Sequence, residues 1–108
     1  SEIDVAEVHD AFAVCEPMAL ESLGFINPGE GINMIKKLHE TNNFMINPRG
    51  GLIGSGHPLG ATGISQTIEI VQQLQKTAEN RQTNNPKMGL IHNMSAAATS
   101  STVLVLGK

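Results

Sequence analysis

A glycine-rich segment carries the residue best suited to chemistry. Residues 47–63 read Asn-Pro-Arg-Gly-Gly-Leu-Ile-Gly-Ser-Gly-His-Pro-Leu-Gly-Ala-Thr-Gly and hold six of the eleven glycines. Such a run is typical of a tight loop held close to another group, because glycine otherwise costs conformational entropy. His57 comes just before a predicted helix, whose positive N-terminal end favours the neutral imidazole. A neutral imidazole can act as a general base or hydrogen-bond donor; the same histidine could also merely cap the turn.

Phosphate-binding interpretations of this segment fail on spacing. The spacing of Gly54, Gly56 and Gly60 is one residue longer than the dinucleotide-binding fingerprint allows. A P-loop requires a lysine where the sequence has His57.

A metal site is not indicated either. Tight ligand spacing is absent among the candidate ligands, which are His9, Cys15, His39 and His92. We interpret His39 as a solvated side chain at a polar helix end. Cys15 falls on the apolar side of a helix, where a buried, inert thiol is expected.

The first half of the chain must position these residues through short elements. A weakly alternating stretch from Ile3 predicts a strand ending near His9. Asp10 is a candidate N-cap for a helix that ends at Gly24, although Pro17 would move its start to Glu16 or kink it. That helix would present an apolar face of Phe12, Val14, Met18, Ala19, Leu20 and Leu23. A turn at residues 27–29 and a short surface helix over 30–39 follow. Asn42-Asn43 then ends this helix before a strand over 44–46.

The second half predicts one long helix and two strands. The helix begins near residues 59–61 and lines one apolar face with Ile64, Ile68, Val71 and Leu74. A polar, mobile connector spans 78–86. Strands over 88–91 and 102–106 flank a small-residue bend at 95–101 and can pair as a hairpin. The order is β-α-β-α-β-β with a short extra helix, which predicts a layered α/β domain over residues 1–108.

Composition limits the classes of protein. The 108 residues are 40% hydrophobic, carry a net charge of −3 and contain three Phe but no Tyr or Trp. These features argue against nucleic acid as a partner, which calls for a basic surface or stacking aromatics. A single cysteine suits a reducing compartment. No apolar run is long enough for a membrane span, and the acidic start is no signal peptide. We expect a soluble, cytoplasmic protein.

Three ordered motifs closely resemble the thiolase family, especially its sterol-carrier-protein and archaeal branch. The segment 47–63 resembles the Gly-His-Pro block of that family. Glu7-Val8-His9-Asp10-Ala11-Phe12 is similar to the branch's His-Asp-Cys-Phe motif, the counterpart of Asn-Glu-Ala-Phe in other thiolases. Residues 22–30 match the segment that follows, and His92-Asn93 resembles the start of the last active-site loop. The resemblance covers essentially the whole chain.

The resemblance implies chemistry on acyl-CoA. Thiolases join or split acyl-CoA molecules by Claisen condensation through an acyl-cysteine. The family role of activating that cysteine falls on His57, and His9 lines the oxyanion site, where donors must be preorganised. Phe12 would serve packing. Gly56, Pro58 and Asn93 are the substrate-binding candidates. Coenzyme A enters as the substrate thioester, with no separate cofactor and no metal, and a homo-oligomer is expected.

Several family features are missing. The nucleophilic cysteine belongs to the family's N-terminal half, so we expect a fragment that lacks the domain's first strand and helix, self-associates and is inactive alone. The acid/base cysteine is also absent, because Ala11 and the segment 92–94 occupy its two family positions. His92 could replace that base or be structural. The family's glycine-rich last loop is Ser95-Ala96-Ala97-Ala98 here.

Two other interpretations stay open. The missing acid/base cysteine favours a thiolase-like protein that has lost condensation. Such a protein would serve as an acyl-CoA- or lipid-binding subunit or as a scaffold subunit. A relative of β-ketoacyl synthases fits the layered fold but fits Gly-His-Pro poorly.

Overall fold

Strands and helices alternate along the chain much as the sequence predicts. The computed structural model describes residues 2–40 and 45–108, with all their side chains other than those of Lys36, Leu38 and His39. Its strands are β1 (Val5–Glu7), β2 (Met45–Ile46), β3 (Met88–Met94) and β4 (Ser101–Gly107). Its helices are α1 (Cys15–Ser22), α2 (Gly31–Glu40), α3 (Gly51–Ser55) and α4 (Thr62–Gln75), with 3-10 turns η1 (Glu79–Arg81) and η2 (Ala96–Ala98).

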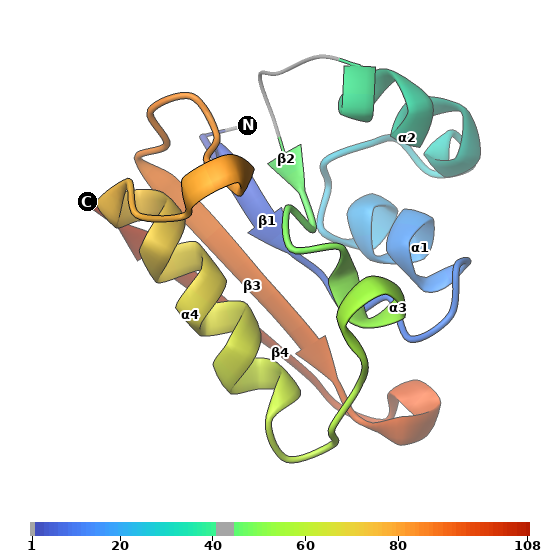
Figure 1. Cartoon of the computed structure of the whole chain (residues 1–108). Helices are drawn as coiled ribbons and strands as arrows, with labels where there is room; N and C mark the ends of the chain where they lie inside the picture. The colour runs from blue at the N-terminus through green and yellow to red at the C-terminus, as the bar shows by residue number, and fades with distance from the viewer. Residues whose placement is uncertain (1, 41–44) are drawn as a thin grey trace.

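The strands form one mixed sheet in the order β2-β1-β3-β4 (Figure 1). Strand β1 pairs in parallel with both β2 and β3, and β3 pairs antiparallel with β4. The predicted C-terminal hairpin and the α/β fold class are therefore confirmed. Because β1 and β3 are parallel, the segments that follow their carboxyl ends meet at one edge of the sheet.

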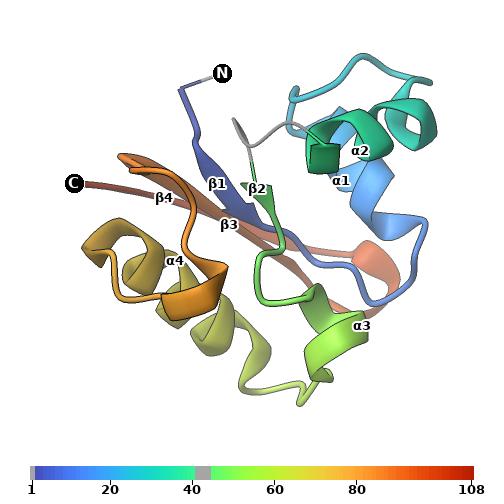
Figure 2. The ribbon, with the colours of Figure 1, turned by 45° about the horizontal axis from the view of Figure 1, so that its top comes forward.

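Helices cover both faces of the sheet (Figure 2). On one face, Ala6, Val8 and Leu90 form a core with α1 through Ala19 and Leu20. On the other, Val5 and Ile91 pack against Ile70 and Leu74 of α4. This division follows the alternation of side chains along β1 and β3.

Helix α4 turns a polar face inward, contrary to the predicted apolar face. Ile64 and Ile68 are 64% and 53% exposed, and only Leu74 of the predicted set is buried. The buried polar side chains of the helix are Thr62, Gln66, Glu69 and Gln73. Burial of polar groups is tolerated where each finds hydrogen-bond partners. Those partners lie in the loop before α4 for Thr62, on β3 for Gln66 and in the connector for Glu69 and Gln73.

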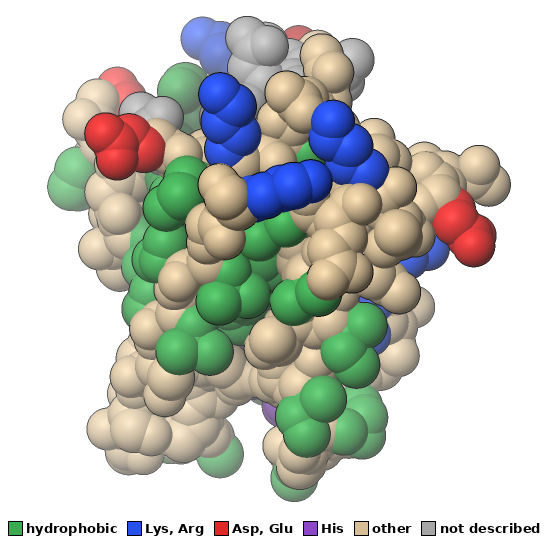
Figure 3. All heavy atoms as spheres, turned by 90° about the vertical axis from the view of Figure 1, so that its left-hand side faces the viewer, with side chains coloured by type: hydrophobic (Ala, Val, Ile, Leu, Met, Phe, Trp, Pro, Cys, Tyr) green, Lys and Arg blue, Asp and Glu red, His purple; other side chains and the backbone are tan. Residues whose placement is uncertain are grey.

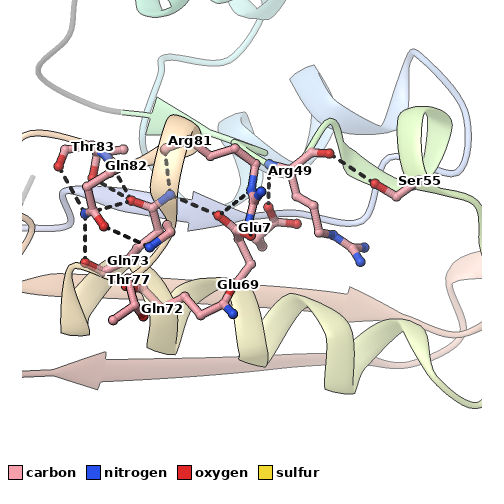
Figure 4. Close-up of polar contacts among 11 residues, drawn as sticks. Glu7, Arg49, Ser55, Glu69, Gln72, Gln73, Thr77, Arg81, Gln82 and Thr83 are labelled. Carbon is pink, nitrogen blue, oxygen red and sulfur yellow. Dashed lines mark hydrogen bonds and ion pairs between the residues drawn. The ribbon is translucent and has the colours of Figure 1, made fainter.

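Gln73 ties the connector 78–86 to α4 (Figure 4). Its amide nitrogen donates to Glu69 Oε1 at 2.9 Å and to the carbonyl of Arg81 at 2.7 Å. Its Oε1 accepts from the backbone N–H of Thr83 at 2.8 Å. Arg81 and Glu69 add an ion pair at 3.1 Å. The connector is thus anchored through several side-chain bonds, unlike the loose link that its composition predicts.

Helix α1 begins at Cys15, one residue before the start at Glu16 that Pro17 predicts, and not next to Asp10. Its N-cap position is Val14, without a side-chain cap, and Pro17 lies in the first turn, where it is tolerated. Asp10 caps a different helix, because its Oδ1 accepts from the N–H of Leu52 in α3 at 2.6 Å. Of the predicted apolar face, only Ala19 and Leu20 are buried, whereas the exposed members are Phe12, Val14 and Met18. Phe12 therefore does not pack within the described chain.

The glycine-rich segment is part loop and part helix, since α3 lies within it. Sequence reasoning missed α3 because glycine is a poor helix former. Cys15 is half-buried, not the buried thiol expected. The predicted break at Asn42-Asn43 and the residue Phe44 lie outside the described residues, as does the side chain of His39. Across the described ranges, no helix has both the length and the apolar character needed to cross a bilayer.

Candidate functional site

Two predicted site histidines meet where β1 ends. His9 follows β1, and His57 lies in the loop between α3 and α4. Their ring centroids are 4.9 Å apart with an edge-to-face angle of 86°. Asn93 reaches the same place from the neighbouring strand β3, and its side chain forms a hydrogen bond with the side chain of His9. Residues separated by 48 and 36 positions in the sequence are thus brought into one cluster.

The first turn of α4 fixes the ring of His57. Its Nδ1 lies 2.7 Å from Oγ1 of Thr62, and that hydroxyl donates to the carbonyl of Pro58 at 3.2 Å. Since the hydroxyl has one proton, Nδ1 is the donor in the first contact and Nε2 keeps the free lone pair. This is the tautomer that a base acting through Nε2 requires.

His9 is held neutral by its surroundings. Burial lowers the pKa of His9, and its neighbour His57 lowers it further, whereas the hydrogen bond with Asn93 and the charge of Asp10 oppose the shift. His9 as a whole is 4% exposed, and its Nδ1 has no hydrogen-bond partner among the described residues. A neutral imidazole carries one N–H group, which can donate a hydrogen bond to a developing oxyanion.

Asn93 is oriented by a residue that sequence reasoning missed. Its Nδ2 donates to Oε1 of Gln66 at 2.9 Å, and Gln66 Nε2 donates to the carbonyl of His92 at 3.3 Å. Helix α4 can approach β3 here because a Cβ on Gly63 would lie only 3.3 Å from Asn93 Nδ2. Gln66 carries no sequence signal other than its position four residues after Thr62, on the same helix face.

His92 lies on the opposite face of β3 from Asn93. Side chains alternate along a strand, and Leu90, two residues earlier, packs in the α1-side core. His92 is 7% exposed, and its Nδ1 has no hydrogen-bond partner among the described residues. Burial lowers its pKa, with a smaller contribution from His9. The structure thus leaves His92 out of the His9–His57 contact, and its role as a base stays a prediction.

Gly56 and Pro58 flank His57 and shape its loop. Gly56 has φ +85°, and a Cβ there would meet nothing, so backbone conformation alone requires glycine. The Pro58 carbonyl accepts from the N–H groups of Ala61 and Thr62, at 2.8 and 3.1 Å, and so starts α4. Their part in substrate binding stays a prediction.

The loop between β3 and β4 places alanines in a glycine-type conformation. Ala97 has φ +61° and Ala98 has φ +54°. This left-handed region is unfavourable for residues with a Cβ. The loop therefore has a backbone suited to glycine at a place where the sequence has alanine.

Replacing Ala97 with glycine is expected to stabilise the protein by about 1 kcal/mol, since the left-handed penalty of about 1–2 kcal/mol is relieved and partly offset by greater unfolded-state entropy. Chemical denaturation would measure the gain. The control is Ala96→Gly, which lies outside this conformation and should only destabilise. A loss of stability in both variants would contradict the assignment.

An apolar groove opens beside Asn93. Figure 3 shows hydrophobic side chains gathered on this side of the molecule, over α4 and β4. The cavity measures about 620 Å³ and lies between the first turns of α4 and the β3–β4 hairpin, with Leu59, Ile64, Ile68 and Leu104 among its lining. Within the ranges described, no group of three His, Cys, Asp or Glu side chains is arranged to hold a metal ion.

The layered α/β fold and the histidine loop at the sheet edge together define a thiolase-like domain. The family model described as thiolase C-terminal domain-like matches residues 1–108. The chain belongs to this family, which confirms the resemblance drawn from its three motifs.

Curated relatives and a solved structure agree with this assignment. The chain is 38% identical to an acetyl-CoA acetyltransferase of Methanothermobacter thermautotrophicus over 99% of its length and 28% of the relative's. It is 42% identical to sterol carrier protein 2 of Homo sapiens, covering 87% of the chain and 18% of that protein. The solved structure of an Ltp2-ChsH2(DUF35) aldolase superposes with a TM-score of 0.82 at 25% identity, covering 99% of this chain and 27% of that one. The chain thus spans less than a third of these proteins.

Proposed function

We propose that this chain is the C-terminal part of a thiolase-type acyltransferase that acts on acyl-CoA by Claisen condensation or thiolysis. The observation that carries the proposal is the contact of His9 with His57, with Asn93 beside them. An acetyl-CoA acetyltransferase among the relatives supports the substrate class. The coenzyme A thioester is the substrate, and no further cofactor is proposed.

In this proposal, His57 handles the proton of the nucleophile. A cysteine from another part of the complete protein attacks the acyl carbonyl, and Nε2 of His57 takes the thiol proton. The coenzyme A thiolate then leaves, and an acyl-cysteine remains. His9 and Asn93 donate hydrogen bonds where the thioester oxygen becomes negative.

A second candidate function is a non-catalytic acyl-CoA- or lipid-binding or scaffold subunit. It is favoured by Ala11, which stands where the related branch has its acid/base cysteine, and by the alanines at positive φ in the last loop. Sterol carrier protein 2 among the relatives is compatible with it. A cytoplasmic location and a homo-oligomer belong to both candidates as proposals.

Exchange of the acetyl methyl protons of acetyl-CoA with deuterated water separates the two functions. If His92 is structural, the complete protein should form an acyl-enzyme yet exchange these protons very slowly, because no base is present. Ala11→Cys should then raise the exchange rate by about 100-fold, the scale of general-base catalysis. NMR of the methyl signal measures the rate.

The variant His92→Ala is the control for this experiment. Rapid exchange in the unmodified protein that disappears in His92→Ala would show that His92 is the base. Rapid exchange that survives this change would place the base outside the chain and contradict our account of Ala11. Failure to form any acyl-enzyme would favour the binding subunit.

A further inference from the structure

The end of β1 and the glycine-rich segment are joined by side chains as well as by backbone. The N–H of Asn47 donates to the carbonyl of Ala6 at 2.8 Å, and the N–H of Val8 donates to Asn47 Oδ1 at 2.8 Å. The Asp10 carboxylate makes the next connection, to Leu52 in α3. Strand β1 and the residues that follow it to Asp10 are thus attached to the segment that leads to His57 by both backbone and side-chain hydrogen bonds.

Asp10 fits this place closely. It is 4% exposed, and its Oδ1 accepts from the buried N–H of Leu52 at 2.6 Å. Gly51 lies directly against the carboxylate, because a Cβ at that position would overlap the Asp10 side chain. Gly51 also has φ +62°, a conformation that glycine adopts without strain. Its lack of a side chain is therefore required twice, by backbone conformation and by contact with Asp10.

The hydrogen bond from Asp10 continues to the residue before His57. The N–H of Leu52 donates to Asp10 Oδ1, and the carbonyl of Leu52 accepts from the N–H of Gly56 at 2.8 Å. Because α3 has only five residues, a displacement of Leu52 by Asp10 also displaces Gly56 at the other end of this single turn. On the other side, Asp10 is covalently next to His9. One carboxylate is therefore linked by short paths to both rings of the pair.

We propose that Asp10 is a positioning residue of the His9–His57 pair: its carboxylate holds α3 and, through Leu52 and Gly56, sets His57 against His9. Asp10 itself touches no reacting group. The proposal deepens the proposed function, but its central claim concerns ring geometry and holds whether or not the protein is an acyltransferase.

Two conservative variants separate position from charge. In Asp10→Asn, the amide oxygen can still accept from Leu52 while the charge is lost. In Asp10→Glu, the charge remains but the longer side chain moves the acceptor away from its place against Gly51. The measurement is NMR of the complete chain with ¹³C-labelled histidine, which reports the environment of each ring. We expect the His57 signals to stay in place in Asp10→Asn and to shift in Asp10→Glu.

Asp4 offers a matched control at the other end of the sheet. Its Oδ2 accepts from the N–H groups of Lys87 and Met88, at 2.8 and 3.0 Å, so Asp4→Ala also removes a carboxylate that accepts hydrogen bonds from the backbone. This variant should lower the melting temperature without moving the signals of His9 or His57. Asp10→Ala should do both.

Activity adds a second readout if the complete protein is an acyltransferase. A misplaced His57 should lower kcat by about 100-fold in Asp10→Glu, the scale for a catalytic group displaced by about 1 Å, with KM within about twofold. Asp10→Asn should retain most of kcat. If the unmodified protein has no acyltransferase activity, the proposed function is contradicted, whereas the positioning role of Asp10 is still decided by the NMR measurement.

Three results would overturn the positioning role. One is an Asp10→Glu protein whose His57 signals match those of the unmodified protein. Another is a shift of His57 in Asp10→Asn as large as in Asp10→Glu, which would show that keeping the acceptor in place does not keep the His57 ring in place. The third is an equal shift in Asp4→Ala, which would make general loosening the cause.

Discussion

Replacing His57 with alanine is expected to lower the turnover of the complete enzyme by about 100-fold or more, the usual scale for a general base or an oxyanion donor. The ring is held by Thr62 and borders His9, so its removal takes away a group at the centre of the cluster. Stability should change little, because His57 is only partly buried in a loop. Steady-state kinetics and thermal unfolding together measure the two effects.

Thr62→Val is a milder variant that tests the same role of His57. It keeps His57 but removes the hydroxyl that accepts from Nδ1, so the preferred tautomer is lost. We expect a loss of about tenfold in kcat, smaller than for His57→Ala. If His57→Ala instead melts much earlier and keeps its activity per folded molecule, the histidine is a structural cap and the proposed role is wrong.

The motifs predicted which residues lie together better than periodicity predicted the packing. His9, His57 and Asn93 could be named from the sequence because short motifs carry their identity in residue type and spacing. That two of them come from the adjacent ends of β1 and β3 follows from parallel pairing, which the order of elements implies. Their contact distance could not be predicted, since it depends on how α3 and α4 are seated.

Helix α4 shows why periodicity alone misled. Ile64 and Ile68 recur at helical spacing and predict a buried face, yet Gln66, Glu69 and Gln73 lie inward. The inward face is polar because each of these side chains finds a specific partner on β3 or the connector. Such pairing is a tertiary property and leaves no periodic signal. Asp10 is similar: its type predicted a helix cap, but the helix that it caps lies 42 residues away.

Glu7→Gln is expected to remove a large pH dependence of stability. Glu7 is fully buried in the central strand β1 and faces α4, and burial raises its pKa from 4.5 to about 7. Its Oε1 accepts from the N–H of Arg49 at 3.4 Å, whereas Oε2 has no hydrogen-bond partner among the described residues (Figure 4). The attraction of Arg49 opposes the shift but is outweighed by burial, and Glu69 adds repulsion.

The sign follows from the raised pKa. The folded protein holds the Glu7 proton more tightly than the unfolded chain, so the stabilising contribution is complete below pH 4.5 and is lost as the pH rises through about 7. A difference of 2.5 pKa units corresponds to about 3 kcal/mol between pH 4 and pH 8. Glutamine is neutral throughout this range and has no such term.

Denaturant unfolding of both proteins at several pH values isolates the effect, since all other titrations cancel in the difference. Relative to the unmodified protein, Glu7→Gln should gain about 3 kcal/mol from pH 4 to pH 8. Glu69→Gln is the matched control, because Glu69 is equally buried but paired with Arg81. Removing a paired charge leaves its partner with a weaker acceptor, so this variant should lose stability near neutral pH. A difference for Glu7→Gln that does not change with pH would show that Glu7 stays ionised, with Arg49 compensating its burial in full.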